Sequence, residues 1–371
     1  MKPLCERLLA EIVDHVWPET TTVLIYGAGH TGHLVAQCLS AQGIKVEAFL
    51  DHRAAAGQVI DGIPVLRAEE AGGFAHIPVL VAVFNPLRSS RFSDIANYLN
   101  SVGFKSVCSL EQFYLAHPHF FPNIYWLTDR TFYKGHWTDV MAVDELWADV
   151  RSRELYRALI EHRTTGRTDC LPEPDALELQ YVPDDVPLRR QEHNFIDIGA
   201  FDGDTLEALR GKKWSLKRVL AFEPDMNNFK KLCERVNNNG PYAEEVILIP
   251  AGVGDQCMTL GFSGDASSGS KVVDIANSGF HIPVVALDAA VHGFAPSYIK
   301  MDIEGAEESA LMGMRDTIMK NRPTLAISAY HRPQDIFAIP LLLKGWGYSA
   351  DFYLRMYGEH TFETVLYAIP K

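Results

Sequence analysis

The sequence predicts an α/β protein with two mostly parallel sheets, the second of which ends in an antiparallel hairpin. Three observations support this fold class. Short apolar runs alternate with helical segments in both halves of the chain, a glycine-rich turn follows the first run of each half, and two strand-like runs close the sequence. At 371 residues the chain is longer than most single domains, so we expect two domains joined by connecting material.

The first predicted domain spans residues 1–114 and has the alternation of a small parallel, Rossmann-like unit. Its helix is predicted to start at Gly32. Its strands are predicted at 23–26, 46–50, 79–84 and 106–110. Residues 115–190 differ, because aromatic residues are followed by an amphipathic helix across 147–162 and then by a proline-bearing stretch, which predicts a helical connecting arm.

The second α/β domain is predicted at residues 191–371. Its five parallel strands are expected at 194–198, 219–222, 246–250, 298–301 and 324–328. Two further runs, 351–357 and 361–369, are separated by three residues and predict a hairpin. A parallel sheet closed by an antiparallel final strand resembles the Rossmann-like sheet of class I methyltransferases.

Composition narrows the classes of partner. Hydrophobic residues make up 47% of the chain and charged residues 22%, which suits two globular cores. The formal charge of −13 argues against nucleic acid and anionic membranes as partners and favours a small molecule. Six scattered cysteines, apolar residues at helical spacing across residues 4–16, and the lack of a long apolar run predict a cytoplasmic protein with reduced thiols.

The glycine-rich turn of the second half, in Phe195-Ile-Asp-Ile-Gly-Ala-Phe-Asp-Gly-Asp-Thr205, is acidic. Three carboxylates, Asp197, Asp202 and Asp204, would repel a pyrophosphate but suit a ligand with an ammonium and a sulfonium, such as S-adenosylmethionine. Glu223 ends the next strand 24 positions after Gly199, where a carboxylate can accept both ribose hydroxyls.

Four phrases resemble the FkbM-type S-adenosylmethionine-dependent methyltransferases: "FIDIGAFDGDT", "FEPD", "YIKMDIEGAE" and "ISAYHRPQDI". The resemblance covers about residues 175–371 and implies O-methylation of sugars or secondary metabolites. It implies that the methionine end is held by Asp197, Gly199, Ala200, Phe201, Gly203 and Thr205. Glu223 would hold the ribose. We also place Pro224, Asp225 and Val253 in the cofactor site, because they follow the ends of the next two strands; Asp225 also suits the start of a helix.

Asp302, Glu304 and His331 follow the ends of the fourth and fifth strands and are the predicted catalytic residues. Either Asp302 or His331 could accept the proton of the acceptor hydroxyl. An open alternative for His331 is a residue that enters a helix and bonds to backbone. Another is that the three side chains hold a divalent cation that orients a hydroxylated acceptor.

The first glycine turn, Gly27-Ala-Gly-His-Thr-Gly32, has an acidic residue of its own, Asp51, at the end of the second strand. Three interpretations stay open, in this order: a docking or dimerisation role, a nucleotide-linked substrate, and NAD. The second rests on a resemblance of residues 51–66 to the N-terminal domains of sugar acyltransferases, with Arg53 as a phosphate ligand. If the first turn were the functional one, the chain would be an NAD- or nucleotide-sugar-binding protein with a vestigial methyltransferase site.

Overall fold

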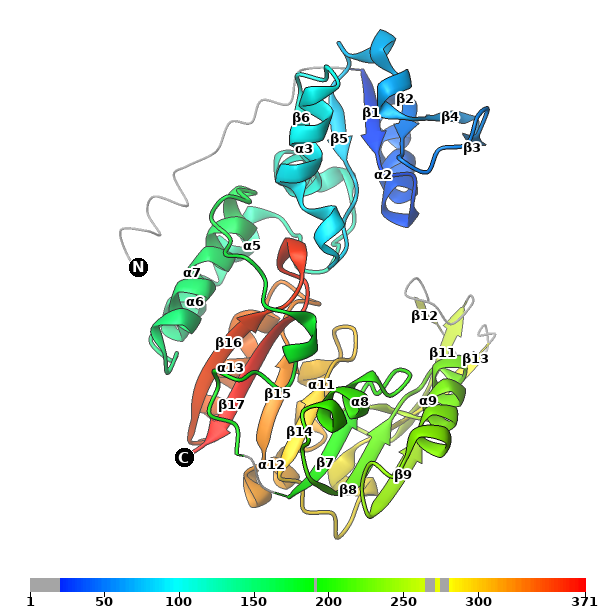
Figure 1. Cartoon of the computed structure of the whole chain (residues 1–371). Coiled ribbons are helices and arrows are strands. Elements are labelled where there is room, and N and C mark those ends of the chain that lie inside the picture. The colour runs from blue at the N-terminus through cyan, green and yellow to red at the C-terminus, as the bar shows by residue number, and fades with distance from the viewer. Residues whose placement is uncertain (1–20, 190–191, 264–270, 274–279) are drawn as a thin grey trace. The chain divides into compact units, whose positions relative to one another are not determined.

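The structure is a computed structural model that describes residues 21–189, 192–263, 271–273 and 280–371. The stretch at 4–16 with helical spacing lies outside these residues. The chain divides into two compact units (Figure 1). The first holds the chain up to residue 145, residues 153–175 and the loop 356–362, and the second holds 146–152, 176–355 and 363–371. These units do not follow the predicted boundaries at 114 and 190, since the predicted arm contributes to both.

The first unit is built on a six-stranded sheet with the order β3-β4-β2-β1-β5-β6. All its pairings are parallel except that of β3 with β4. The strands are β1 Thr22–Tyr26, β2 Lys45–Leu50, β3 Val59–Ile60, β4 Ile63–Leu66, β5 Val79–Val81 and β6 Val107–Ser109. The hairpin of β3 and β4 was not predicted, although its two-residue Asp61-Gly62 loop has the positive φ angles of +51° and +80° that such a turn requires.

In sequence, two of the described helices of the first unit lie between its strands and four follow the last strand, β6. They are α2 His30–Ala41, α3 Phe92–Ser101, α4 Leu110–Ala116, α5 Arg130–Gly135, α6 Trp137–Asp144 and α7 Val150–Thr165, whose first turn belongs to the second unit. The core beneath the sheet joins fully buried side chains of β1, β2 and β5, such as Leu24, Leu50 and Val79, to Leu99 of α3. Helix α2 begins two residues before the predicted start, since Gly29 is its N-cap.

The second unit is built on a seven-stranded sheet with the order β16-β17-β15-β14-β7-β8-β9 (Figure 1). The strands are β7 His193–Ile198, β8 Leu216–Phe222, β9 Glu245–Ile249, β14 Tyr298–Met301, β15 Thr324–Ser328, β16 Ala350–Met356 and β17 Thr364–Pro370. Five strands are parallel and β17 runs antiparallel to β15. The predicted fold class is confirmed.

Burial explains why the central strands are mostly apolar and do not alternate between apolar and polar residues. Every residue of β14, β15 and β17 is buried, as expected where helices cover both faces of a parallel sheet. The covering helices are α8 Asp204–Gly211, α9 Met226–Asn239, α10 Leu287–Ala290, α11 Glu307–Met312, α12 Arg315–Asn321 and α13 Asp335–Gly345. The carboxyl ends of the parallel strands therefore meet at one edge, where ligands bind in such sheets.

A small second sheet in this unit was not predicted. It has the order β10-β13-β11-β12. Its strands are β10 Gly252–Val253, β11 Met258–Ser263, β12 Lys271–Val273 and β13 Phe280–Val285. It lies in sequence between β9 and β14, so the chain leaves the main sheet and returns before the fourth parallel strand.

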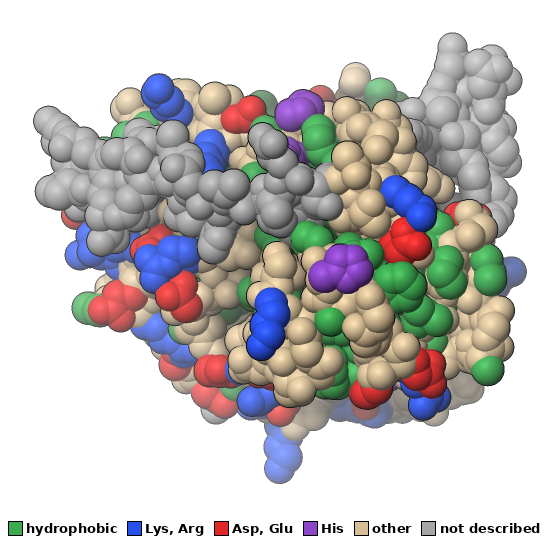
Figure 2. Space-filling model, turned by 90° about the horizontal axis from the view of Figure 1, so that it is seen from above, with side chains coloured by type: hydrophobic (Ala, Val, Ile, Leu, Met, Phe, Trp, Pro, Cys, Tyr) green, Lys and Arg blue, Asp and Glu red, His purple; other side chains and the backbone are tan. Residues whose placement is uncertain are grey.

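On the face drawn in Figure 2, the described Lys and Arg side chains are interspersed with Asp and Glu side chains. No helix in the described part of the chain has the length and apolarity that spanning a membrane requires.

Candidate active site

The turn between β7 and α8 is held tightly against the neighbouring strands. The amides of Gly199 and Ala200 both donate to the carbonyl of Phe222 at the end of β8, at 3.0 and 2.9 Å. Gly199 has φ +81°, and a Cβ there would lie 1.8 Å from the carbonyl oxygen of Asp302 at the end of β14. Glycine is therefore required at 199 both for its conformation and for the close approach of the two strand ends. Gly203, with φ +87°, is the N-cap of α8.

The carboxylate of Glu223 bridges this turn and the end of β8. Its Oε2 accepts from the amide of Phe201 at 2.8 Å, and its Oε1 accepts from the amide of Asp225 at 2.8 Å. Burial raises the pKa of Glu223, an effect that these two backbone amides oppose. Each carboxylate oxygen can accept more than one hydrogen bond, so this arrangement leaves acceptor capacity for ribose hydroxyls.

Three other predicted cofactor residues lie beside this carboxylate or at the next strand. Asp225 Oδ1 caps α9 by accepting from Asn227 and Asn228, both at 2.9 Å, so the helix-start interpretation applies to it. Its Oδ2 is buried and has no hydrogen-bond partner among the described residues. Pro224 is half-buried between Glu223 and Asp225, and Val253 is buried on β10.

The predicted negative charge of the glycine turn is largely compensated, which corrects the charge argument. Asp197 lies 3.1 Å from the ammonium of Lys300, and both side chains are buried within the sheet. Asp202 accepts from Arg235 at 2.6 Å. Asp204 accepts from the amide of its neighbour Thr205 at 2.7 Å. Two of the three carboxylates are therefore neutralised by cations from neighbouring elements. The sequence prediction missed these cations because local sequence does not reveal which side chains the strand register places alongside.

The remaining turn residues differ in exposure. Ala200 and Thr205 are buried, whereas Phe201 is 49% exposed and has φ +48°. A backbone in the left-handed region is unusual for a residue with a bulky side chain. The backbone of Phe201 is held by the hydrogen bond that its amide donates to Glu223, while its ring is exposed to solvent.

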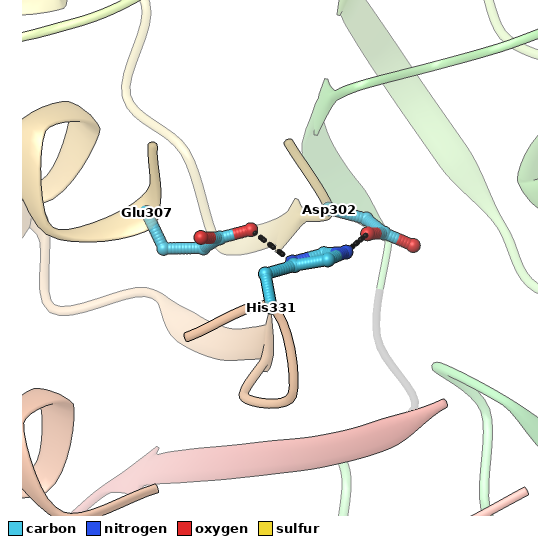
Figure 3. A group of neighbouring side chains, drawn as sticks. All are labelled: Asp302, Glu307 and His331. Atoms are coloured by element: carbon cyan, nitrogen blue, oxygen red, sulfur yellow. Dashed lines mark hydrogen bonds and ion pairs between the residues drawn. The ribbon is translucent and has the colours of Figure 1, made fainter. Parts of the chain in front are cut away.

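The strand ends next to the glycine turn bring the three predicted catalytic residues together. His331 Nε2 lies 3.3 Å from Asp302 Oδ1 and 3.8 Å from Glu304 Oε2. On the other side of the ring, His331 Nδ1 lies 2.8 Å from Oε1 of Glu307, the first residue of α11. Figure 3 shows the imidazole between the carboxylates of Asp302 and Glu307.

This arrangement determines the charge of the histidine. Burial disfavours the imidazolium of His331, but the hydrogen bond and charge of Glu307, together with the charges of Asp302 and Glu304, outweigh burial and raise the pKa to about 10. A histidine with this pKa carries a proton on both nitrogens at neutral pH. Of the two predicted base candidates, Asp302 is therefore better suited to accept a proton.

Several groups near His331 were not predicted. Glu307 was visible in "YIKMDIEGAE", three residues after Glu304, but its position at a helix start gave no sign that it would face the histidine. Tyr181 and Glu363 gave no local signal, since they lie in irregular segments far from the motifs. Burial raises the pKa of Glu363 to about 7, with the charge of Asp302 adding to the effect. Asp335 behaves similarly, since burial and Glu307 raise its pKa to about 7.

The side chains around His331 lie close enough together to hold a cation. Ligand atoms of Asp302, Glu307 and His331 all lie within 4.8 Å of one another. The two ring nitrogens of His331 face opposite carboxylates, so a single ion cannot use both sides. An ion at Nε2 would take Asp302 and Glu304 as its carboxylates, and Glu307 would orient the ring through Nδ1.

Comparison with known proteins agrees with the fold. Residues 197–350 match the family model described as the methyltransferase FkbM domain. The chain is similar to the crystal structure of methyltransferase FkbM from Methylobacillus flagellatus KT, with 22% identity, a TM-score of 0.78 and coverage of 94% of this chain and 90% of that one. No curated protein matches the chain.

Two other solved structures share much less. A precorrin-6y C5,15-methyltransferase from Geobacter metallireducens GS-15 has 13% identity, a TM-score of 0.30 and coverage of 49% of this chain and 82% of that one. An rRNA methylase from Streptococcus thermophilus has 17% identity, a TM-score of 0.31 and coverage of 52% and 92%. Residues 197–350 are thus the part of the chain that matches the methyltransferase FkbM domain model, and the fold agrees with this match.

Proposed function

We propose that the chain transfers the methyl group of S-adenosylmethionine to a hydroxyl of a small acceptor, a sugar or a secondary metabolite. One observation carries this proposal: the close packing of Gly199 on the backbone of Asp302, which sets a carboxylate directly beside the glycine turn. A donor held at the turn would then have an acidic side chain next to its reactive end.

The residues of the turn fit S-adenosylmethionine. Glu223 would accept hydrogen bonds from the ribose hydroxyls, and the buried Oδ2 of Asp225 offers a further acceptor beside it. Phe201 would cover the ligand from the solvent side. When bound, S-adenosylmethionine supplies an activated methyl group on a sulfonium.

Asp302 is the group best placed to take the acceptor's proton. Its side chain is 24% exposed, whereas that of His331 is 2% exposed, so an acceptor can reach Asp302 and not the histidine. With S-adenosylmethionine bound at the turn, the Asp302 carboxylate would accept the proton of the acceptor hydroxyl as its oxygen takes the methyl group, and S-adenosylhomocysteine would be the leaving group. Alignment can account for about 7 to 11 kcal/mol of the barrier in favourable cases, and the base for a further factor of about 10² to 10⁴.

A divalent cation is an alternative way to orient the acceptor at the same residues. It would bind Asp302, Glu304 and the Nε2 atom of His331, and it would require that nitrogen to lose its proton. Methyl transfer measured after chelation with EDTA, and again after addition of Mg²⁺, Mn²⁺ or Ca²⁺, distinguishes the two. Activity that survives chelation excludes the cation.

Labelling tests the proposal as a whole. The protein is incubated with S-adenosylmethionine carrying a labelled methyl group and an extract of its own host, and the labelled product is identified by mass spectrometry. A labelled ether on a small molecule supports O-methylation. A labelled amine or carbon, or a labelled macromolecule, contradicts it.

Calorimetry tests the competing proposal that the first glycine turn binds NAD or a nucleotide sugar. Micromolar binding of S-adenosylhomocysteine without binding of NAD supports the methyltransferase. The opposite result supports the alternative.

We also propose that the acceptor can be a nucleotide-linked sugar and that the first unit mediates homo-oligomerisation. Light scattering of the whole chain, and of a variant with altered surface residues on β3 and β4, checks the proposed oligomerisation.

A further inference from the structure

We infer that Tyr181 is a positioning residue that orients the Asp302 carboxylate for the proposed methyl transfer. The inference rests on the proposed function. Tyr181 lies outside the family-matched residues 197–350, so the family match assigns it no role. It belongs to the same compact unit as Asp302.

The first observation is the contact that Tyr181 makes. Its hydroxyl donates to Asp302 Oδ2 at 2.8 Å and lies 3.2 Å from Ser328 Oγ at the end of β15. The other oxygen of Asp302, Oδ1, faces His331. Both carboxylate oxygens are thus held from different directions, and this fixes the plane of the carboxylate that the acceptor meets.

The second observation is how firmly Tyr181 itself is held. It is a bulky residue with φ +66°, in the left-handed region that bulky side chains avoid. Its amide donates to the hydroxyl of Tyr367 at 3.2 Å, and its carbonyl accepts from the hydroxyl of Tyr298. A residue kept in an unfavourable conformation by its surroundings is characteristic of a functional site.

The third observation separates the hydroxyl from the ring. The ring is buried, and the ammonium of Lys300 lies 5.3 Å from its centroid, contacts that a phenylalanine could also make. The hydroxyl is therefore the part of Tyr181 that acts on Asp302, and its removal leaves the contacts of the ring in place.

The variant Tyr181→Phe removes only the hydroxyl. We expect kcat to fall by about 10- to 100-fold because the carboxylate loses its fixed orientation, while KM stays within about threefold of wild type. The affinity for S-adenosylhomocysteine, measured by calorimetry, should be unchanged. A kcat within twofold of wild type, or an equal loss of cofactor affinity, would overturn the inference.

Tyr348→Phe is the matched control. Tyr348 is also buried in the second unit and donates its hydroxyl to the carbonyl of Pro323, away from the site. We expect it to lower the unfolding temperature at least as much as Tyr181→Phe and to keep wild-type kcat. A loss of kcat in both variants would mean that removal of any buried hydroxyl from this unit impairs turnover, which would contradict a specific role for Tyr181.

A double-mutant cycle on thermal unfolding tests the contact without any acceptor. We expect Tyr181→Phe to lower the unfolding temperature in the wild type and to lower it less in the Asp302→Ala background, where its partner is gone. Equal lowering in both backgrounds would show that the hydroxyl does not act through Asp302. If the wild type methylates no hydroxyl, the proposed function fails and this cycle still decides whether the two residues are coupled.

Discussion

The two glycine turns of the chain share one backbone framework and differ in the side chains around it. In the first, the amide of Gly27 donates to the carbonyl of Leu50, and the amide of Ala82 to that of Tyr26. In the second, the amide of Gly199 donates to the carbonyl of Phe222, and that of Asp302 to Ile198. The strand register agrees, since Tyr26 pairs with Val81 as Ile198 pairs with Met301.

The acidic residue after the second strand is also equivalent. Asp51 accepts from the amides of Ala28 and Arg53 at 3.0 and 2.8 Å. Glu223 accepts from the amides of Phe201 and Asp225, which occupy comparable positions. A carboxylate at this point therefore stabilises the turn whether or not a ligand binds, and an acidic residue there is not sufficient to infer a nucleotide site.

The two turns differ at the end of the strand that pairs with the strand before the turn, which is β5 in the first unit and β14 in the second. Asp302 of the second unit corresponds to Ala82 of the first, and the buried pair of Asp197 and Lys300 corresponds to Ile25 and Leu80. The first unit thus has the turn without an ionisable group at the adjacent strand end. A docking or dimerisation role for the turn at residues 27–32 stays a prediction.

The largest expected effect comes from the residue that distinguishes the two turns. Asp302→Asn keeps the shape of the side chain and removes the base, so we expect kcat to fall by about 10²- to 10⁴-fold. The affinity for S-adenosylhomocysteine should stay within a few-fold of wild type. Glu308→Gln, an exposed acidic position on α11, serves as the control and should retain wild-type kcat. Full activity of Asp302→Asn would refute its assignment as base or cation ligand.

A second prediction compares the two equivalent carboxylates. Glu223→Gln should weaken S-adenosylhomocysteine binding by about 10- to 100-fold, because hydrogen bonds to a charged group contribute about 1.5 to 3 kcal/mol. Asp51→Asn should change neither this affinity nor kcat, since the first turn takes no part in the proposed reaction. Calorimetry on both variants checks this. Equal losses would mean that both turns contribute to cofactor binding.

Part of this comparison could be predicted from sequence. Turns after apolar runs, and acids at the ends of those runs, are local patterns, so Glu223, Asp302 and His331 could be placed at one sheet edge. The partners of buried charges could not, because Lys300 reaches Asp197 only through the register of β14 against β7. Tyr181 and Glu363 come from irregular segments, whose return to the site depends on tertiary packing that no periodicity encodes.

A third prediction tests whether both turns need their close approaches. A Cβ on Gly32 would lie 2.0 Å from the carbonyl oxygen of Gly27, much as one on Gly199 would lie 1.8 Å from that of Asp302. Both alanine variants should lower the free energy of unfolding, by about 1 to 3 kcal/mol, through overpacking. Only Gly199→Ala should also lose S-adenosylhomocysteine binding. Loss of binding in Gly32→Ala would show that the first turn affects the cofactor site.

The last comparison concerns a buried glutamate–histidine pair in each unit. In the first unit, His360 Nδ1 lies 2.6 Å from Glu111 Oε1, and His360 Nε2 lies 2.8 Å from the carbonyl of Ser90. Burial opposes the charge of His360, but Glu111, with a smaller contribution from Glu359, raises its pKa. Burial opposes the charge of Glu111 too, but His360 and His162 lower its pKa to about 2. Burial lowers the pKa of His162, the third group beside this pair.

These directions set the pH dependence of the pair. Because the folded-state pKa of His360 is above the unfolded value of about 6.5, its contribution to stability is complete below that pH and is lost as pH rises through the folded value, at about 1.4 kcal/mol per pH unit. Since Glu111 is charged above about pH 2, the acid side does not limit the pair near neutrality. The difference in unfolding temperature between wild type and His360→Gln should therefore be larger at pH 6 than at pH 9, by a few degrees. A difference that stays constant or grows with pH would show that His360 is neutral in the folded protein, and that the first unit, unlike the second, holds its histidine by packing rather than by charge.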